Sequence, residues 1–327
     1  MNNKRRIAME QPRIFYFSRH FGHPAGGVRT AYSHVRVLRS HGFEASILLT
    51  TERRDDFAAA DVPVSQFQSG MALSANDIVV IPEGWHEYIR SFGASPIRTF
   101  VFCQNHYYAH EGLGDARTYS DLGVERVFCG SDYIAKGLAE LQGDDGAPVV
   151  TYAIDPILFT PGEKRRQIAF MPRKRREEAK FIRENFPRLF PQHASVPWTE
   201  IDNMTEPETA AVLGESAIFL ALGRLEGLGL PPLEAMSSGC LVTGFLANGG
   251  VEYGVAGNGL WCDAEDWSGA MRSLARALEL LDSEQGKRMI DAGRRTAAWY
   301  SPDRMKNSLL AFWRDAADRD GQKLRRT

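Results

Sequence analysis

Short apolar runs alternate with amphipathic segments along the first half of the chain. The segment 26–41 is typical of a helix, because Val28, Ala31, Val35 and Leu38 recur at helical spacing. Each parallel strand needs a crossover to reach the next, so this alternation predicts a doubly wound parallel sheet. The expected strands span residues 13–18, 45–50, 78–81, 99–103, 127–129 and 149–153.

A break follows at residues 155–161, where Pro156 and Pro161 precede a charged stretch that is typical of an interdomain linker. We therefore predict one domain over residues 1–155, a second over 156–300 and a terminal helix over 301–327. Ser301 and Pro302 suit the start of that helix as N-cap and first helical residue. In the second domain we expect strands at 168–171, 196–201, 217–222 and 240–245, and helices at 177–185, 206–215 and 267–281.

The second domain contains a Gly-rich turn between two apolar strands. Gly227 and Gly229 can take backbone angles closed to residues with a Cβ, so amide N–H groups of this turn can approach a ligand closely. Glu226 lies in the turn, and Glu234 follows with seven residues between them. The turn thus offers N–H donors for an anion and carboxylates that accept from hydroxyls, and a nucleotide sugar contains both kinds of group.

Pro231 and Pro232 suit the start of a short helix that ends near Gly239, because a first-turn proline gives up an N–H that had no partner. This start places Glu234 in the first helical turn, beside the partial positive charge of the helix N-terminus. A purely structural interpretation stands beside the functional one. In it, Glu234 complements the helix dipole and Glu226 is a solvated loop residue.

The complete string favours the functional interpretation. Residues 226–239 read Glu-Gly-Leu-Gly-Leu-Pro-Pro-Leu-Glu-Ala-Met-Ser-Ser-Gly between two strands. This string resembles the donor-site signature of the retaining glycosyltransferases of the GT-B fold, family four. Residues 154–161 resemble the Ile-Asp-x-x-x-Phe-x-Pro crossing segment of the same enzymes. The resemblance implies two Rossmann-like α/β domains whose parallel sheets face each other across a cleft, and a C-terminal helix that crosses back to the N-terminal domain.

The resemblance also implies roles for single residues. Glu234 would accept hydrogen bonds from the ribose hydroxyls of the donor, and Glu226 would bind the hydroxyls of the transferred sugar. The amides of the turn would orient the sugar and phosphates; its residues are Gly227, Leu228, Gly229 and Leu230.

Gly26 and Gly27 precede the first amphipathic helix, where family members have a Gly-Gly pair that faces the donor phosphates and the acceptor. Taken alone, the pair also suits a tight strand-to-helix turn. The surrounding loop, residues 18–29, lacks Gly-x-Gly-x-x-Gly, which argues against an NAD enzyme.

Arg173 and Lys174 follow the first strand of the second domain, where the resembling enzymes bind the donor diphosphate. Arg can direct two hydrogen bonds onto phosphate oxygens, and Lys adds a point charge. Pro172 replaces the glycine of the family pattern, and neither Lys174 nor Lys180 has its lysine spacing, so the choice between them stays open. The wider basic run over 164–188 is typical of a solvated helix face and leaves a local anion site open.

His106 follows an apolar strand among aromatic residues. A packed or capping role competes with a place in the cleft, where family members often have a His that touches the donor sugar or acceptor. The predicted catalytic residues are Glu226, His106 and Arg173. We expect Ser131 to cap a helix. Residues 248–252 resemble a donor-side loop, and a structural role is left open for Glu252, the last of them.

Composition narrows the class of protein. The net charge of −2 argues against a globally basic nucleic-acid binder, and no apolar run is long enough for a transmembrane helix. The polar N-terminus lacks a signal core, so we expect a cytoplasmic protein. The four scattered cysteines suggest buried thiols. No residues have metal-ligand spacing, which predicts metal-independent transfer with no cofactor and with the diphosphate charge met by basic groups and helix N-termini.

The leading hypothesis is a retaining glycosyltransferase that moves a sugar from a nucleoside-diphosphate sugar to a hydroxyl of a glycan, a lipid-linked glycan or another acceptor. The second domain has room for about one strand-helix unit between Arg173 and Ile218, fewer than is usual for the family. That shortening leaves open a nucleotide-sugar-binding partner without turnover. Transfer to a DNA base through the basic run is a third alternative, which the charge balance disfavours.

Overall fold

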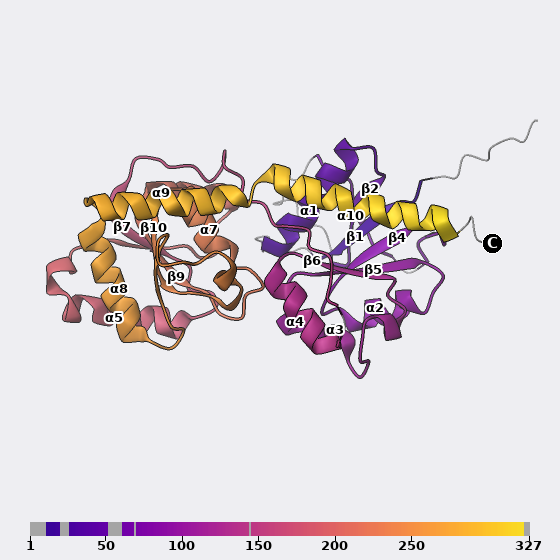
Figure 1. Cartoon of the computed structure of the whole chain (residues 1–327), viewed down its shortest axis with the longest axis horizontal. Helices are drawn as coiled ribbons and strands as arrows, with labels where there is room; N and C mark the ends of the chain where they lie inside the picture. The colour runs from indigo at the N-terminus through magenta and orange to yellow at the C-terminus, as the bar shows by residue number, and fades with distance from the viewer. Residues whose placement is uncertain (1–10, 20–25, 52–60, 69, 144, 324–327) are drawn as a thin grey trace, which may run out of the picture. The chain divides into compact units, whose positions relative to one another are not determined.

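The computed structural model describes residues 11–19, 26–51, 61–68, 70–143 and 145–323. The chain divides into two compact units, one of residues 1–103 with 108–128 and one of residues 104–107 with 129–327 (Figure 1). The boundaries at 155 and 300 stay a prediction from the linker. No helix of the described ranges is long and apolar enough to cross a membrane.

A six-stranded parallel sheet organises the N-terminal part, in the order β3-β2-β1-β4-β5-β6. This is the strand order of a doubly wound sheet, and every residue of β1 is buried, as expected where helices cover both faces. Its strands are β1 (Ile14–Ser18), β2 (Ala45–Leu49), β3 (Val64–Gln66), β4 (Ile78–Pro82), β5 (Arg98–Cys103) and β6 (Arg126–Cys129). The accompanying helices are α1 (Gly26–Ser40), α2 (His86–Gly93) and α3 (Ala109–Leu113), with the 3-10 turn η2 (Ser120–Leu122). The 3-10 turn η1 (His106–Tyr108) follows β5 in the chain, and α4 (Asp132–Gln142) follows β6 and belongs to the second unit.

A five-stranded parallel sheet organises the second unit, in the order β11-β10-β9-β7-β8. Its strands are β7 (Arg165–Phe170), β8 (Trp198–Glu200), β9 (Ser216–Leu222), β10 (Leu241–Phe245) and β11 (Leu260–Cys262). The strand order reverses between the neighbours β7 and β9. In open α/β sheets, ligands bind beyond the carboxyl ends of the strands at such a switch point.

Helices cover both faces of the second sheet. Figure 1 shows α7 and α9 on one side of it and α5 and α8 on the other. The helices and 3-10 turns are α5 (Arg176–Leu189), η3 (Pro191–His193), α6 (Glu206–Glu215), α7 (Leu230–Ser237), η4 (Asn248–Glu252), α8 (Trp267–Leu280), α9 (Glu284–Trp299) and α10 (Pro302–Lys323). The start of α6 has a full capping box, in which Thr205 and Glu208 satisfy each other's backbone N–H groups.

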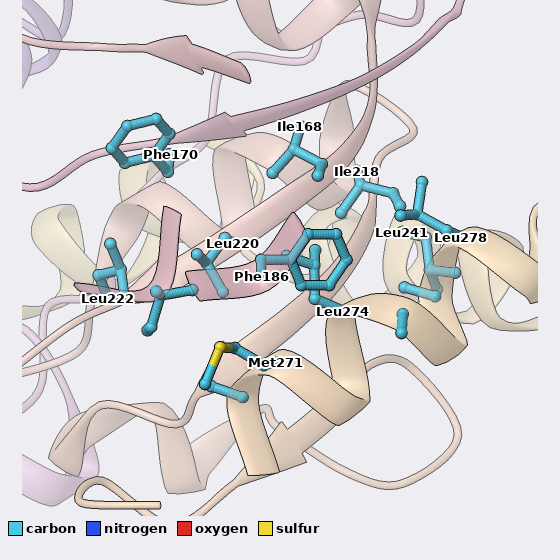
Figure 2. Close-up of a cluster of buried hydrophobic side chains, with 14 of the residues drawn as sticks. Ile168, Phe170, Phe186, Ile218, Leu220, Leu222, Leu241, Met271, Leu274 and Leu278 are labelled. Carbon is cyan, nitrogen blue, oxygen red and sulfur yellow. The ribbon is translucent and has the colours of Figure 1, made fainter. Parts of the chain in front are cut away.

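Apolar side chains of β7, β9 and β10 pack against α5 and α8 (Figure 2). Ile168, Ile218 and Leu241 come from the three strands, and Phe186 and Leu274 come from the two helices; all five are fully buried. Burial of aliphatic and aromatic side chains on this scale fixes the sheet, and therefore fixes where the loops beyond its strands begin.

Most expected strands and helices are confirmed within a few residues, and α6 matches the expected 206–215 at both ends. The expected strand at 149–153 is wrong, since only Val149 forms a bridge, to Cys129. The strands β3 and β11 and the helix α9 were not predicted from the sequence. Ser301 caps α10 as expected, because its Oγ accepts a hydrogen bond from the N–H of Arg304 at 3.2 Å. The crossing of α10 back to the N-terminal domain stays a prediction.

Candidate functional site

Lys174 and Glu226 meet at the switch point of the second sheet. Lys174 lies in the turn after β7, and Glu226 lies in the loop after β9. The Lys174 Nζ is 3.0 Å from the Glu226 Oε1, and the two side chains keep 21% and 23% of their exposure. The structure thus brings together a predicted cation and a predicted carboxylate where an α/β sheet binds its ligands.

The first carbonyls of the loop 225–230 accept hydrogen bonds from neighbouring groups. The Leu225 carbonyl accepts from the Asn105 Nδ2 at 2.8 Å and from the Lys174 Nζ at 3.2 Å. The Glu226 carbonyl accepts from the N–H of Gly249 at 3.0 Å. The loop is therefore held by polar contacts from segments far away in sequence.

Two more carbonyls of the loop are held by hydroxyl groups. The Gly227 carbonyl accepts from the Ser131 Oγ at 2.9 Å, and the Gly229 carbonyl accepts from the Tyr253 Oη at 2.8 Å. In a trans peptide the N–H points opposite to the C=O, so each following N–H points away from its anchoring group. Within the described ranges, the N–H groups of Gly227, Leu228 and Leu230 have no acceptor. Gly227 and Leu228 are buried, and buried N–H groups are seldom left unpaired, so the donors of this loop point to a ligand.

Two glycines allow the loop to pack this closely. A Cβ on Gly227 would lie 2.3 Å from the Gln104 carbonyl oxygen and 2.7 Å from the Ile134 Cδ1. A Cβ on Gly249 would lie 2.2 Å from the Gly227 carbonyl oxygen. Any side chain at either position would force the loop away from its anchoring groups.

Leu225 has a φ of 49°, in the left-handed region that L-residues seldom occupy. Its N–H donates to the Asn248 Oδ1 at 3.0 Å, and its carbonyl has the two donors given above. These bonds hold a conformation that the leucine would otherwise leave, which is common at functional loops.

Glu234 is buried in α7, with 3% of its surface exposed. Its predicted place in the first turn is wrong. The helix begins at Leu230, ahead of both prolines, and this shifts Glu234 to the second turn. Because the effect of the helix dipole falls off within the first turn, the structural interpretation of Glu234 as a dipole partner loses its main support.

The basic residues after β7 divide into exposed and buried groups. Arg173 is exposed in the turn, whereas the Arg175 side chain keeps 2% of its exposure. The Arg175 guanidinium lies 4.8 Å from the centre of the Phe245 ring, and its Nε donates to the Gly223 carbonyl at 3.3 Å. Arg175 therefore supports the start of the loop after β9. Nothing in the run of basic residues distinguishes Arg175, so its buried position was not predicted from the sequence.

Much of the remaining basic run is paired with carboxylates. The pairs are Arg165 with Glu215, Arg166 with Asp282, Arg176 with Asp202 and Arg183 with Glu200. A paired and solvated surface of this kind fits the interpretation of a helix face and gives no support to a nucleic-acid site.

His106 packs on α4. A Cβ on Gly137 of that helix would lie 2.3 Å from the His106 Cδ2, and the ring centre lies 4.2 Å from that of Tyr107. Burial lowers the pKa of His106, and the charge of Glu140 opposes this shift. These contacts favour the packed alternative for a neutral His106, and its catalytic role stays a prediction.

Ser131 caps α4 as expected, accepting from the N–H of Ile134 at 3.2 Å. The Glu252 carboxylate accepts a hydrogen bond from the N–H of Tyr133 in the same first turn. Burial raises the pKa of Glu252. The structural role left open for Glu252 is the one that these contacts support.

Gly26 and Gly27 are the first residues of α1, and the Gly26 carbonyl accepts from the Thr30 Oγ1 at 2.8 Å. The preceding residues 20–25 lie outside the described residues. A contact of this pair with a donor stays a prediction.

The described residues contain no group of three or more His, Cys, Asp or Glu side chains that could hold a metal ion. The four cysteines form no disulfide with one another. Cys103, Cys129 and Cys240 are buried as expected, and Cys262 is half-buried. Burial raises the pKa of Cys240 to about 11, so its thiol stays protonated at neutral pH.

Solved structures with the same architecture are glycosyl-transferring enzymes. A sucrose-phosphate synthase from Thermosynechococcus elongatus has a TM-score of 0.71 at 13% identity, over 94% of this chain and 99% of that one. HepE from Anabaena, solved with UDP and glucose, has a TM-score of 0.71 at 11% identity, over 93% of this chain and 100% of that one. A glycosyltransferase from Rickettsia africae ESF-5 has a TM-score of 0.68 at 13% identity, over 94% of this chain and 98% of that one. Together with the two parallel sheets, these likenesses establish the α/β GT-B fold.

No family model matches the chain. It is, however, 33% identical over 228 residues to an α-1,6-glucosyltransferase of Actinobacillus pleuropneumoniae serotype 7 (strain AP76), covering 67% of this chain and 68% of that protein. The chain belongs to the glycosyltransferases and is an enzyme that transfers glycosyl groups. This relationship favours the enzyme over the binding-only partner.

Proposed function

We propose that this enzyme is a family-four retaining glucosyltransferase that moves glucose from UDP-glucose to a hydroxyl of a glycan or lipid-linked glycan, without a metal ion. The observation that carries the proposal is the Lys174–Glu226 pair at the switch point. It lies beside a loop whose carbonyls are anchored and whose N–H groups at Gly227, Leu228 and Leu230 have no acceptor among the described residues. This arrangement offers cations and N–H donors to a diphosphate and carboxylates to sugar hydroxyls.

Each group has a role in the proposed reaction. Glu226 binds hydroxyls of the glucose, Glu234 binds the ribose, and the amides of 227–230 contact the sugar and phosphates. The glucose C1–O bond to the β-phosphate breaks, and its electron pair leaves with UDP. The acceptor oxygen bonds to C1 from the same face, and its proton passes to the departing phosphate. Lys174 and Arg173 stabilise the charge that develops on the diphosphate, which is the main electrostatic demand of the step.

Lys174 is the better supported of the two candidate lysines. Its Nζ already contacts the loop, 3.2 Å from the Leu225 carbonyl and 3.0 Å from Glu226. A bound diphosphate would compete with Glu226 for this cation, which would free the Glu226 carboxylate for sugar hydroxyls. The pair thus gives both residues a partner before the donor arrives.

The relatives support the choice of sugar and stereochemistry. The Actinobacillus relative is named an α-1,6-glucosyltransferase, and HepE was also solved with UDP-glucose. Glucose is α-linked in UDP-glucose, so an α-linked product keeps the configuration at C1. Retention by attack on the same face needs no protein nucleophile.

The test is a UDP-release assay with UDP-glucose and a panel of glucosides and glycans, followed by NMR of the product. We expect UDP release that depends on the acceptor and an anomeric coupling constant typical of an α-glucoside. A β-linked product would overturn retention. Loss of activity in EDTA with recovery on adding manganese would overturn metal independence, and failure to bind any nucleoside-diphosphate sugar would overturn the donor site.

A further inference from the structure

The Tyr253 side chain contacts the loop 225–230. It follows η4, keeps 4% of its exposure and donates from its Oη to the Gly229 carbonyl at 2.8 Å. Gly229 is the N-cap of α7 with a φ of 88°, and a Cβ there would lie 3.2 Å from the Tyr253 Oη. The phenol therefore occupies the space beside a left-handed glycine, where the loop turns into the helix.

A buried amide holds Tyr253 in place. The Asn258 Nδ2 donates to the Tyr253 carbonyl at 2.6 Å and to the Thr296 Oγ1 of α9 at 3.0 Å. The Asn258 Oδ1 accepts from the Val255 N–H at 3.0 Å and from the Trp261 Nε1 at 3.2 Å. All four hydrogen-bonding positions of the amide are thus used. Tyr253 is anchored to α9 and β11, two elements that belong to the packed body of the unit.

The Tyr253 hydroxyl orients one peptide of the loop. Because the bond from Gly229 to Leu230 is trans, holding the Gly229 carbonyl toward Tyr253 directs the Leu230 N–H to the opposite side. That N–H begins α7 and has no acceptor among the described residues. An N–H at the start of a helix is well suited to an anionic oxygen.

We propose that Tyr253 is a positioning residue that aims the Leu230 N–H at a phosphate oxygen of the donor. This inference rests on the proposed function, because it takes the ligand of the loop to be a nucleoside diphosphate. Tyr253 touches neither the donor nor the acceptor in this account. It acts through the Gly229–Leu230 peptide alone.

Tyr253 is suited to this role at any physiological pH. Burial raises the pKa of its phenol well above the ordinary value, so the hydroxyl remains a donor. Ser131 does the equivalent for the Gly227 carbonyl, and two separate hydroxyl groups therefore fix two peptides of one short loop.

The decisive experiment measures the binding of UDP and of uridine to the wild-type enzyme and to Tyr253→Phe by calorimetry. Removing one hydrogen bond of this kind should weaken UDP binding about three- to ten-fold. Uridine lacks the phosphates, so its affinity should not change. Tyr300→Phe is the matched control, since its ring packs against Tyr253 and it loses the same atom. UDP affinity should not change in that variant.

Equal losses of UDP and uridine affinity in Tyr253→Phe would overturn the proposal and leave a merely structural tyrosine. A second measurement does not depend on any variant. In enzyme labelled with ¹⁵N-leucine, UDP should shift the Leu230 amide signal and uridine should not. A Leu230 signal indifferent to UDP would also overturn the proposal. If the wild-type enzyme bound no UDP at all, the proposed function would fail instead, which is a distinguishable result.

Discussion

The two turns at the switch point of the second sheet are built in opposite ways. The loop after β9 is a backbone structure, because glycines let it pack closely and donors from four side chains and one amide hold its carbonyls. The turn after β7 acts through its side chains, with Arg173 exposed, Lys174 reaching across to Glu226 and Arg175 buried. Only the loop after β9, with its glycines, leaves a recognisable pattern in the sequence.

Because the two turns are built differently, substitutions in them should lower activity to different extents. Steric requirements of a packed backbone are strict, since a single Cβ would overlap a carbonyl oxygen. Charged side chains in a half-exposed turn can be rearranged and partly replaced by neighbours, and water screens their interactions. Changes in the loop should therefore cost more activity than changes in the turn.

The strongest test of this comparison is Gly227→Ala. Its Cβ would lie 2.3 Å from the Gln104 carbonyl, so the loop must move, and a displacement on the order of 1 Å costs about 100-fold in rate. Gly257→Ala is the matched control, because nothing lies within 4 Å of a Cβ there. Steady-state kinetics gives kcat/KM for both variants. Equal activity of the two variants would contradict a loop fixed by backbone packing.

Glu226→Gln should have the next largest effect. It keeps the shape of the side chain but removes the charge that pairs with Lys174. In the proposed function, the same charge strengthens hydrogen bonds to sugar hydroxyls. Hydrogen bonds to charged groups contribute about 1.5–3 kcal/mol, so kcat/KM for UDP-glucose should fall about 10- to 100-fold. Glu215→Gln removes an equivalent charge from the exposed pair with Arg165 and should leave kcat/KM unchanged. Unaltered turnover in Glu226→Gln would count heavily against its assigned role.

Arg175→Met should mainly lower stability. It keeps part of the buried stem but loses the bonds to the Gly223 carbonyl and to Glu178 and the contact with Phe245, together about 2 kcal/mol. Urea denaturation measures the free energy of unfolding. Arg173→Met is the matched control, because Arg173 is exposed. This variant should unfold at the same urea concentration as the wild-type enzyme. A stable Arg175→Met variant would show that the buried guanidinium does not support the loop.

The smallest effects should come from the cations of the turn. We expect Lys174→Ala to weaken UDP binding about ten-fold and Arg173→Ala about three-fold, with smaller differences at high salt because exposed charges are screened. Calorimetry at two salt concentrations measures the loss of UDP affinity in each variant and how that loss depends on salt. A larger loss in Arg173→Ala than in Lys174→Ala would contradict the expectation that Lys174, whose Nζ already lies at the loop, contributes more to diphosphate binding than Arg173.

The same contrast explains what the sequence could predict. Apolar runs and the glycine and proline positions indicated β9, α7, β10 and the loop between them, because packing and backbone sterics act locally. The short strands β3 and β11 were missed, since three residues give little periodicity. The burial of Arg175 and the anchoring of the loop by Asn105, Ser131 and Tyr253 depend on residues distant in sequence, and no local pattern reports them.

The close approach of Gly227 and Gly249 also limits how this enzyme can change by mutation. Every amino-acid change at a glycine codon adds a Cβ, and at either position that atom would meet backbone, which cannot turn aside as a side chain can. Enlarging one glycine cannot be compensated by shrinking the other, since neither has an atom to lose. A library of random variants selected for activity should therefore keep glycine at both positions, even where many surrounding surface residues have changed.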